Sequence, residues 1–170
     1  MLEPAFDPVN SPTAVEVQQE TEYRLANNSI SYHTITDVDY SSKWVIYLVN
    51  SPQRQQVAKS IARYFHRETR FDFPPYSPGD ESSERPVYLI RTLRSQTMVP
   101  LIAGAVGFRR ANGIWVLTWV WIHPWVRNGA LAGQVFDTLE TLHGVFAVEG
   151  PLSKAMQALI AKRGGENLEV

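Results

Sequence analysis

The 170-residue sequence contains no cysteine, and this absence excludes several kinds of chemistry. Without cysteine there is no disulfide framework, no thiolate nucleophile and no zinc site with cysteine ligands. The four histidines are scattered, and no two of them lie at the spacing typical of metal ligands: His33, His66, His123 and His143. We therefore expect no metal cofactor.

The sequence also lacks an excess of charge of either sign. Sixteen Lys and Arg residues stand against seventeen Asp and Glu residues, which leaves a formal net charge of −1. A protein-wide field that would attract nucleic acid is therefore absent. No stretch approaches the roughly 18 apolar residues of a membrane span, and the N-terminus does not resemble a signal peptide. We expect no nucleic-acid or membrane partner, and a cytoplasmic protein.

The composition is that of a soluble globular domain, with 44% hydrophobic and 19% charged residues. A length of 170 residues suits one domain. Residues 1–20 are rich in proline, acidic residues and glutamine, which predicts a weakly ordered lead-in. Residues 21–170 are then expected to form a single domain.

Hydrophobic periodicity predicts an alternation of strands and helices. Pro52 follows Ser51, a good helix N-cap, and Asn112-Gly113 is a strong hairpin signal. The predicted elements, in chain order, are strands 30–35 and 44–49, helix 52 to 66 or 68, loop 70–85, strands 86–92, 100–110 and 113–123, helix 128–143, strand 145–148 and helix 151–163.

This order predicts an α/β (α+β) fold, in which helices cover a mixed, mostly antiparallel central sheet. The strand at 113–123 is apolar on both faces, so we expect it in the middle of the sheet. Residues 22–40 are predicted as an N-terminal β extension. We expect it to cover the sheet edge that the short C-terminal region leaves unpaired, within the chain or across a homodimer.

The segment that follows the central strand has features of an anion site. Pro124 cannot donate to a strand ladder, so pairing tends to end there and leaves backbone groups for an extended ligand. Small residues at the start of the next helix would let a diphosphate approach its unpaired N–H groups, and Arg127 adds a positive charge. Close packing of a helix on a sheet requires small residues as well, so the loop alone supports both interpretations equally.

The order of elements makes the pattern more specific. The run 103–108, the hairpin, the strand end 121–124 and the helix start after Arg127 resemble the core of GCN5-related N-acetyltransferases (GNAT). That family's loop motif is Arg/Gln-x-x-Gly-x-Gly/Ala. Here Ala130 stands where the first glycine is usual, and Gly129 could supply the flexible position instead.

The resemblance implies that acetyl-CoA is the co-substrate. Its pantetheine arm would pair with the central strand, and its diphosphate would bind Arg127 and the helix start. The residues expected at the cofactor are Val120, Ile122, Arg127, Asn128, Gly129, Ala130, Leu131, Ala132 and Gly133.

Acetyl transfer to an amine needs a group that takes a proton from the amine. Glu149, after the short strand, is the first candidate, although a solvated Glu before a Gly-Pro turn explains it equally well. His123 is the next candidate, with a strand-end residue as the alternative. Ser153 could protonate the leaving thiolate, or it could be only a first-turn helix residue. The family's usual tyrosine acid falls on Ile160 here.

Two functions remain open from the sequence. The first is an N-acetyltransferase that moves an acetyl group to a primary amine of a small-molecule or peptide acceptor by direct attack. The second is a catalytically inactive binding or regulatory module with the same fold.

Overall fold

The computed structural model describes residues 33–35, 46–91, 101–127, 130–149 and 154–163. The predicted lead-in at 1–20 lies outside these ranges, as do Asn128, Gly129 and Ser153. The elements are β1 (His33–Thr34), β2 (Ile46–Leu48), α2 (Pro52–Thr69), β3 (Val87–Arg91), β4 (Leu101–Ala111), β5 (Ile114–Ile122), the 3-10 turn η1 (Pro124–Val126), α3 (Leu131–His143), β6 (Ala147–Val148) and α4 (Lys154–Lys162).

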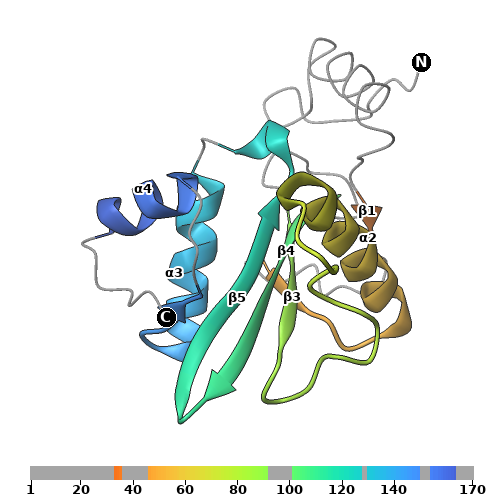
Figure 1. Cartoon of the computed structure of the whole chain (residues 1–170), viewed down its shortest axis with the longest axis horizontal. Helices are drawn as coiled ribbons and strands as arrows, with labels where there is room; N and C mark the ends of the chain where they lie inside the picture. The colour runs from red at the N-terminus through yellow and green to blue at the C-terminus, as the bar shows by residue number, and fades with distance from the viewer. Residues whose placement is uncertain (1–32, 36–45, 92–100, 128–129, 150–153, 164–170) are drawn as a thin grey trace.

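The strands of the described residues form one sheet, in the order β2-β3-β4-β5-β6 (Figure 1). All these pairs are antiparallel except β5 with β6, which is parallel. The mixed, mostly antiparallel sheet predicted from the sequence is therefore confirmed. Val120 and Ile122, the two strand residues expected at the cofactor, lie on β5 of the long β4–β5 pair.

Local sequence signals account for two of the element boundaries. Ser51 caps α2, because its Oγ accepts a hydrogen bond from the N–H of Arg54 at 3.3 Å. The β4–β5 hairpin turns at Asn112 and Gly113, whose φ angles of 52° and 79° are the left-handed values that a type I′ turn requires. Both features agree with the prediction.

The N-terminal extension pairs with a different strand from the one expected. His33 and Thr34 pair with Ile102 and Leu101 at the start of β4, an interior strand, and not with a sheet edge. The reason is that β4 extends past the end of β5. The last bond of the β4–β5 ladder joins the N–H of His123 to the carbonyl of Ala103, and Leu101 and Ile102 lie beyond it. The first residues of β4 are therefore free to accept another strand. The homodimer stays a prediction.

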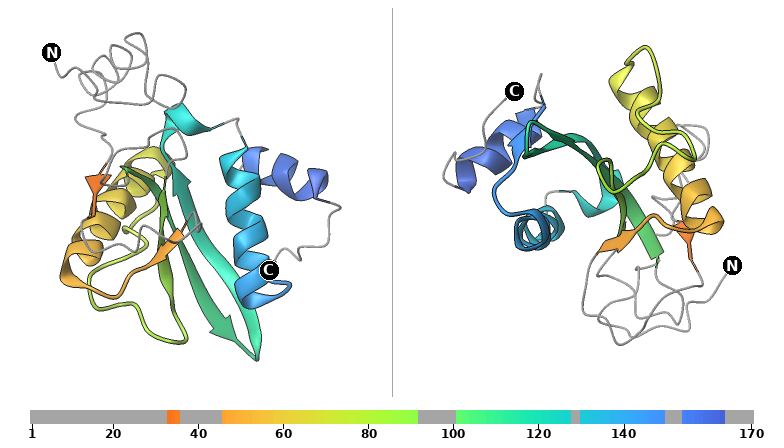
Figure 2. Two further views of the ribbon diagram at one scale, coloured as in Figure 1. Left: turned by 180° about the vertical axis from the view of Figure 1, so that it is seen from behind. Right: turned by 90° about the horizontal axis from the view of Figure 1, so that it is seen from below.

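Helices cover both faces of the sheet. Figure 2 shows α2 on one side, with α3 and α4 on the other. On the first face Ile61 and Phe65 of α2 pack in one cluster with Trp119 and Trp121 of β5. On the second face the buried side of α3 packs against both central strands and against Phe146 and Val148; its buried residues are Leu131, Val135, Phe136 and Leu139.

Candidate functional site

The central hairpin contains an irregularity halfway along. Phe108 lies opposite Leu117 and Gly107 lies opposite Trp119, so Thr118 is an extra residue in β5. Its hydroxyl donates a hydrogen bond to the carbonyl oxygen of Gly107 at 3.1 Å. A β-bulge of this kind bends the strand that carries it and increases its twist. The direction of β5 therefore changes at Thr118.

β6 follows β5 only up to this bulge. It pairs with Val116 and Leu117, and the N–H of Glu149 donates to the carbonyl of Leu117 at 2.9 Å. Beyond Leu117, no strand in the described part of the chain pairs with this edge of β5. Within the described residues, β6 therefore ends beside the bulge, whereas β5 continues to Ile122.

The backbone groups on this open edge can be identified from the ladder. The N–H of His123 bonds to β4. Because the N–H and carbonyl groups of successive residues point to opposite sides of a strand, those of Trp121 also point toward β4. Val120 and Ile122 consequently direct their N–H and carbonyl groups away from β4. The carbonyl of Ile122 accepts a hydrogen bond from Nε of Arg127 at 2.6 Å, which agrees with this assignment. These are the two strand residues predicted at the pantetheine.

Arg127 is held within the protein. Its two terminal nitrogens donate to both carboxylate oxygens of Glu68 at 2.6 and 2.7 Å, and its guanidinium lies 5.5 Å from the ring centroid of Trp121. The indole N–H of Trp121 also donates to Glu68, at 2.7 Å. Arg127 therefore joins the end of α2 to the turn after β5, a connection that the sequence analysis did not predict.

The same contacts shift the acidity of Glu68. Burial by itself would raise the pKa of this carboxyl, but the hydrogen bonds from Arg127 and Trp121 and the charge of Arg127 outweigh it. The pKa of Glu68 is lowered below its ordinary value, so the carboxylate is ionised at neutral pH.

The start of α3 has the features expected of an anion-binding helix end. Ala130, the N-cap residue, is exposed and offers no side-chain hydrogen bond to the first turn, which contains no acidic residue. A Cβ placed on Gly133 would meet no heavy atom within 4 Å. The side chain of Leu131 is buried in the core, so only its backbone could face a ligand. The first N–H groups of a helix lack intrahelical partners and favour anions.

The structure places the two described catalytic candidates very differently. His123 is fully buried, with its ring 5.9 Å from that of Trp121. Glu149 is 39% exposed and its carboxylate lies 3.3 Å from the guanidinium of Arg109 on β4. Of the two, only Glu149 is accessible to a substrate in this conformation. Ile160, on α4, stands where the family's usual tyrosine acid was expected, and its apolar side chain is half-buried against the core.

The described residues contain neither a membrane-spanning helix nor a metal-binding cluster. None of the helices described is long and apolar enough to cross a membrane. No three His, Asp or Glu side chains within the described ranges are grouped so that they could hold a metal ion.

Comparison with known proteins gives a match at the level of fold. No protein-family model and no curated protein matches the sequence. Among solved structures, the chain is similar to YhhK from E. coli, a candidate N-acetyl transferase solved with bound coenzyme A. That match has a TM-score of 0.50 and 14% identity, and covers 72% of this chain and 91% of the other.

The chain is also similar to the acetyltransferase domain of xEco2, solved with a K105–CoA conjugate. Here the TM-score is 0.50 and the identity 12%, over 78% of this chain and 92% of the other. The chain therefore has the fold of GNAT-type N-acetyltransferases, and the fold predicted from the sequence is confirmed.

Proposed function

We propose that this protein is an acyltransferase that uses acetyl-CoA to acetylate a primary amine. One observation carries the proposal: within the described residues β6 pairs with β5 only up to Leu117, and the helix that follows β5 in the chain begins without a side-chain cap. The backbone of Val120 then remains as a strand edge on which the amides of the pantetheine arm could pair. The free N–H groups at the start of α3 would supply the donors for the diphosphate.

The contacts of Arg127 support a different part in this site from the diphosphate contact that the loop motif suggests. Its donors are directed at Glu68 and at the carbonyl of Ile122. We therefore assign it a positioning role: it holds the end of β5 and the turn that leads into α3. The diphosphate contacts are assigned to the backbone of residues 130–133, with Asn128 and Gly129 remaining part of the proposed loop.

The transfer itself is a direct attack. The lone pair of the neutral amine attacks the thioester carbonyl carbon, a C–N bond forms and the C–S bond breaks. The amine proton passes to Glu149 or to solvent, and the thiolate of CoA is protonated to the thiol. The exposed carboxylate of Glu149, where β6 ends beside β5, supports its assignment as the proton acceptor. Ser153 is retained as the candidate acid.

A strand substitution tests where the cofactor binds. Val120→Pro removes one N–H from the open edge, so the fold should persist while the affinity for CoA falls about tenfold, the value of one hydrogen bond. Val116→Pro is the matched control. The carbonyl of Leu117 faces β6, so the N–H of Val116 faces β4, and a proline at this position breaks the β4–β5 ladder. Calorimetric titration with CoA, together with circular dichroism, measures both effects. A folded Val120→Pro protein with unchanged affinity would contradict the placement.

A second variant tests the diphosphate end of the same site. Ala130→Glu places a carboxylate at an exposed helix N-terminus. There it interacts favourably with the helix dipole, so the stability of the fold should not fall. The same charge would repel a diphosphate, so CoA affinity should fall more than tenfold. Wild-type protein that binds no CoA at all would overturn the proposed function.

One specific observation favours the alternative, a catalytically inactive module: Ile160 occupies the position of the family's usual tyrosine acid and has no proton to donate. The two functions differ in a simple measurement. A module of this fold could bind CoA and be stabilised by about 2.7 kcal/mol at 100 times the dissociation constant, but it would release no CoA from acetyl-CoA with any amine.

A further inference from the structure

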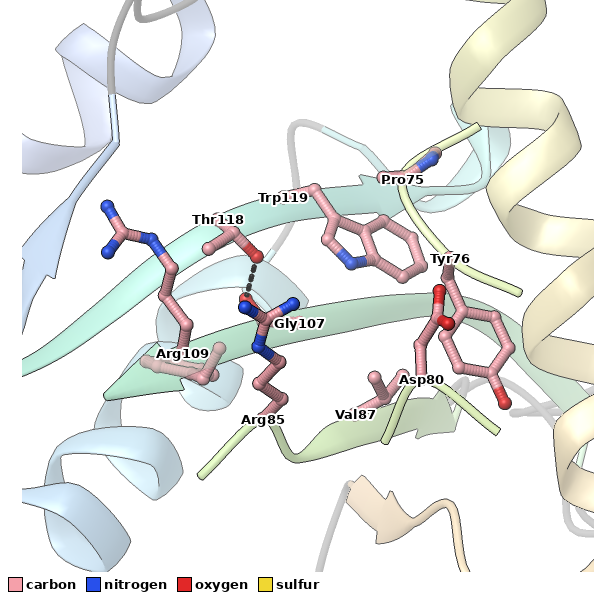
Figure 3. Close-up of a pocket in the computed structure, with 10 residues that line it drawn as sticks. Pro75, Tyr76, Asp80, Arg85, Val87, Gly107, Arg109, Thr118 and Trp119 are labelled. Carbon is pink, nitrogen blue, oxygen red and sulfur yellow. Dashed lines mark hydrogen bonds between the residues drawn. The ribbon is translucent and has the colours of Figure 1, made fainter. Parts of the chain in front are cut away.

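A cavity of about 180 Å³ lies on the α2 side of the sheet at the β4–β5 bulge. Its inner wall is formed by Val87, Gly107 and Trp119 (Figure 3). The indole of Trp119 lies directly over Gly107, since a Cβ on that glycine would be 2.1 Å from Nε1 of Trp119. Only glycine at this position leaves room for the indole, which supplies an apolar surface to the cavity.

The cavity opens beside the proposed site of acetyl transfer. Thr118, the bulge residue beside which β6 ends, is one of its lining residues. Arg109 is another, and its guanidinium contacts Glu149 at 3.3 Å. A molecule in the cavity would therefore lie next to both the bulge and the candidate base.

The loop that closes the cavity contains several acidic residues, and three of them have partners within the protein. Glu81 accepts hydrogen bonds from the hydroxyl of Tyr76 at 2.8 Å, from the N–H of Gly79 at 3.0 Å and from the side chain of Gln55. Glu84 pairs with Arg110 at 3.9 Å. Among the described residues, Asp80 is the only acid that lines the cavity, and one of its oxygens accepts from the N–H of Ser77 at 2.9 Å.

Arg85 differs from these acidic residues in the contacts of its side chain. Its backbone N–H and carbonyl are both bonded to Ser82, at 3.1 and 3.2 Å, so the residue is anchored at the rim of the cavity. Figure 3 shows its guanidinium directed toward Gly107. The residues that the structure describes offer this guanidinium neither a hydrogen-bond acceptor nor an ionic partner. Arg85 is exposed, and a planar guanidinium whose donors have no partner among the described residues matches the geometry of a carboxylate.

We infer that this cavity binds a small amine that also carries a carboxylate, such as an amino acid, with the carboxylate on Arg85. The inference rests on the proposed function and specifies its acceptor. With two arginines and one aspartate, the charged lining has a net positive charge, which suits an anionic group and disfavours a polybasic one. The volume fits a small molecule, and the surfaces of Val87 and Trp119 would contact its carbon skeleton. The acceptor's amine attacks the thioester in the step written above.

The test compares amines that differ only in the carboxylate. Amino acids, their carboxamides and the corresponding decarboxylated amines are incubated with acetyl-CoA, and release of the free thiol is measured. The carboxylate forms should give the highest kcat/KM. Arg85→Ala should raise KM for them roughly ten- to a hundredfold, the value of a charged hydrogen bond, and remove their advantage over the carboxamides. The matched control Arg110→Ala, on the neighbouring strand β4 and paired with Glu84, should change neither value.

Three results would overturn the inference while leaving the proposed function intact: equal or better acetylation of the carboxamides, a preference for lysine-containing peptides, or an unchanged KM in Arg85→Ala. CoA binding, measured on the same proteins by calorimetry, reports on the proposed function separately. If CoA binds but no amine is acetylated, titration of the amino acids into the CoA complex decides. Binding of the carboxylate forms alone supports the assignment of the cavity, and no binding rejects it.

Discussion

Glu149 is the residue whose assignment gains most from its surroundings. Its backbone ends the β5–β6 pairing and its carboxylate contacts Arg109, which lines the cavity at the bulge. From the sequence it was indistinguishable from a solvated glutamate before a turn. Its contact with Arg109 provides a reason why an acidic side chain should be held at this place.

We predict that Glu149→Gln lowers turnover by roughly 10²–10⁴-fold, because it keeps the shape of the side chain and removes its basicity. Affinity for CoA should barely change, since the carboxylate is not among the groups proposed to bind it. Steady-state kinetics with calorimetric titration measures the two effects separately. Asp137→Asn, on the exposed side of α3, is the control and should leave turnover unchanged. Turnover within a few-fold of wild type would show that Glu149 is not the base.

At the scale of elements, the contact between the end of α2 and the turn after β5 depends on one ion pair. Glu68 and Arg127 are 42% and 34% exposed, so solvent screens their attraction. The two elements also share Trp121, which bonds to Glu68 and lies beside the guanidinium of Arg127. The pair thus connects the α2 face of the sheet with the segment that leads to the proposed diphosphate site.

A double-mutant cycle of Glu68→Gln and Arg127→Gln should give a coupling energy of about 0.5–1 kcal/mol in urea unfolding at neutral pH. Because the pKa of Glu68 is lower in the folded protein, its contribution is complete above the ordinary value of 4.5. It is lost as the pH falls through the lowered value. Glu68→Gln should therefore reduce the loss of stability in acid. If the two substitutions change the free energy of unfolding additively, and Glu68→Gln leaves its dependence on acidic pH unchanged, the pair contributes nothing to stability.

The proposed positioning role of Arg127 predicts a second effect of the same variants. Both Glu68→Gln and Arg127→Gln should weaken CoA binding to a similar extent, because each loosens the same turn. If Arg127 contacted the diphosphate directly, only its own substitution would have a large effect.

For the whole molecule, the N-terminal region is the least expected contributor to the core. Ile35 is fully buried in the cluster under α2, and Nε2 of His33 lies 2.9 Å from the hydroxyl of Tyr64. These residues reach the core from a strand that pairs with the interior strand β4. Residues 33–35 are therefore part of the folded core.

Deletion of residues 1–40 should destabilise the protein by several kcal/mol, since loss of a buried isoleucine alone costs about 2–5 kcal/mol. Deletion of residues 1–20 should have little effect on stability. Ile35→Ala in the full chain isolates the packing contribution from the lost strand pairing. Urea unfolding of the four proteins provides the comparison, and a 41–170 fragment as stable as the full chain would show that the segment is dispensable.

The amino-acid sequence by itself determined the features that depend on neighbouring residues. Asn112-Gly113 predicted the hairpin because few residues other than Asn and Gly tolerate the left-handed conformation that both positions adopt. Ser51 predicted the start of α2 because its hydroxyl bonds to an amide only three residues away. Hydrophobic periodicity predicted the order of strands and helices, and with it the fold class.

Only the tertiary structure decided the contacts between distant segments. Arg127 bonds to a glutamate 59 residues earlier in the chain, and no local pattern specifies that partner. The extra residue at Thr118 depends on how β4 and β5 are aligned, and the pairing of β1 depends on where β5 ends. The cavity likewise requires a loop and three strands to meet. Register and long-range distance are set when the whole chain packs, which is why the sequence could suggest candidate site residues but not the partners that they contact.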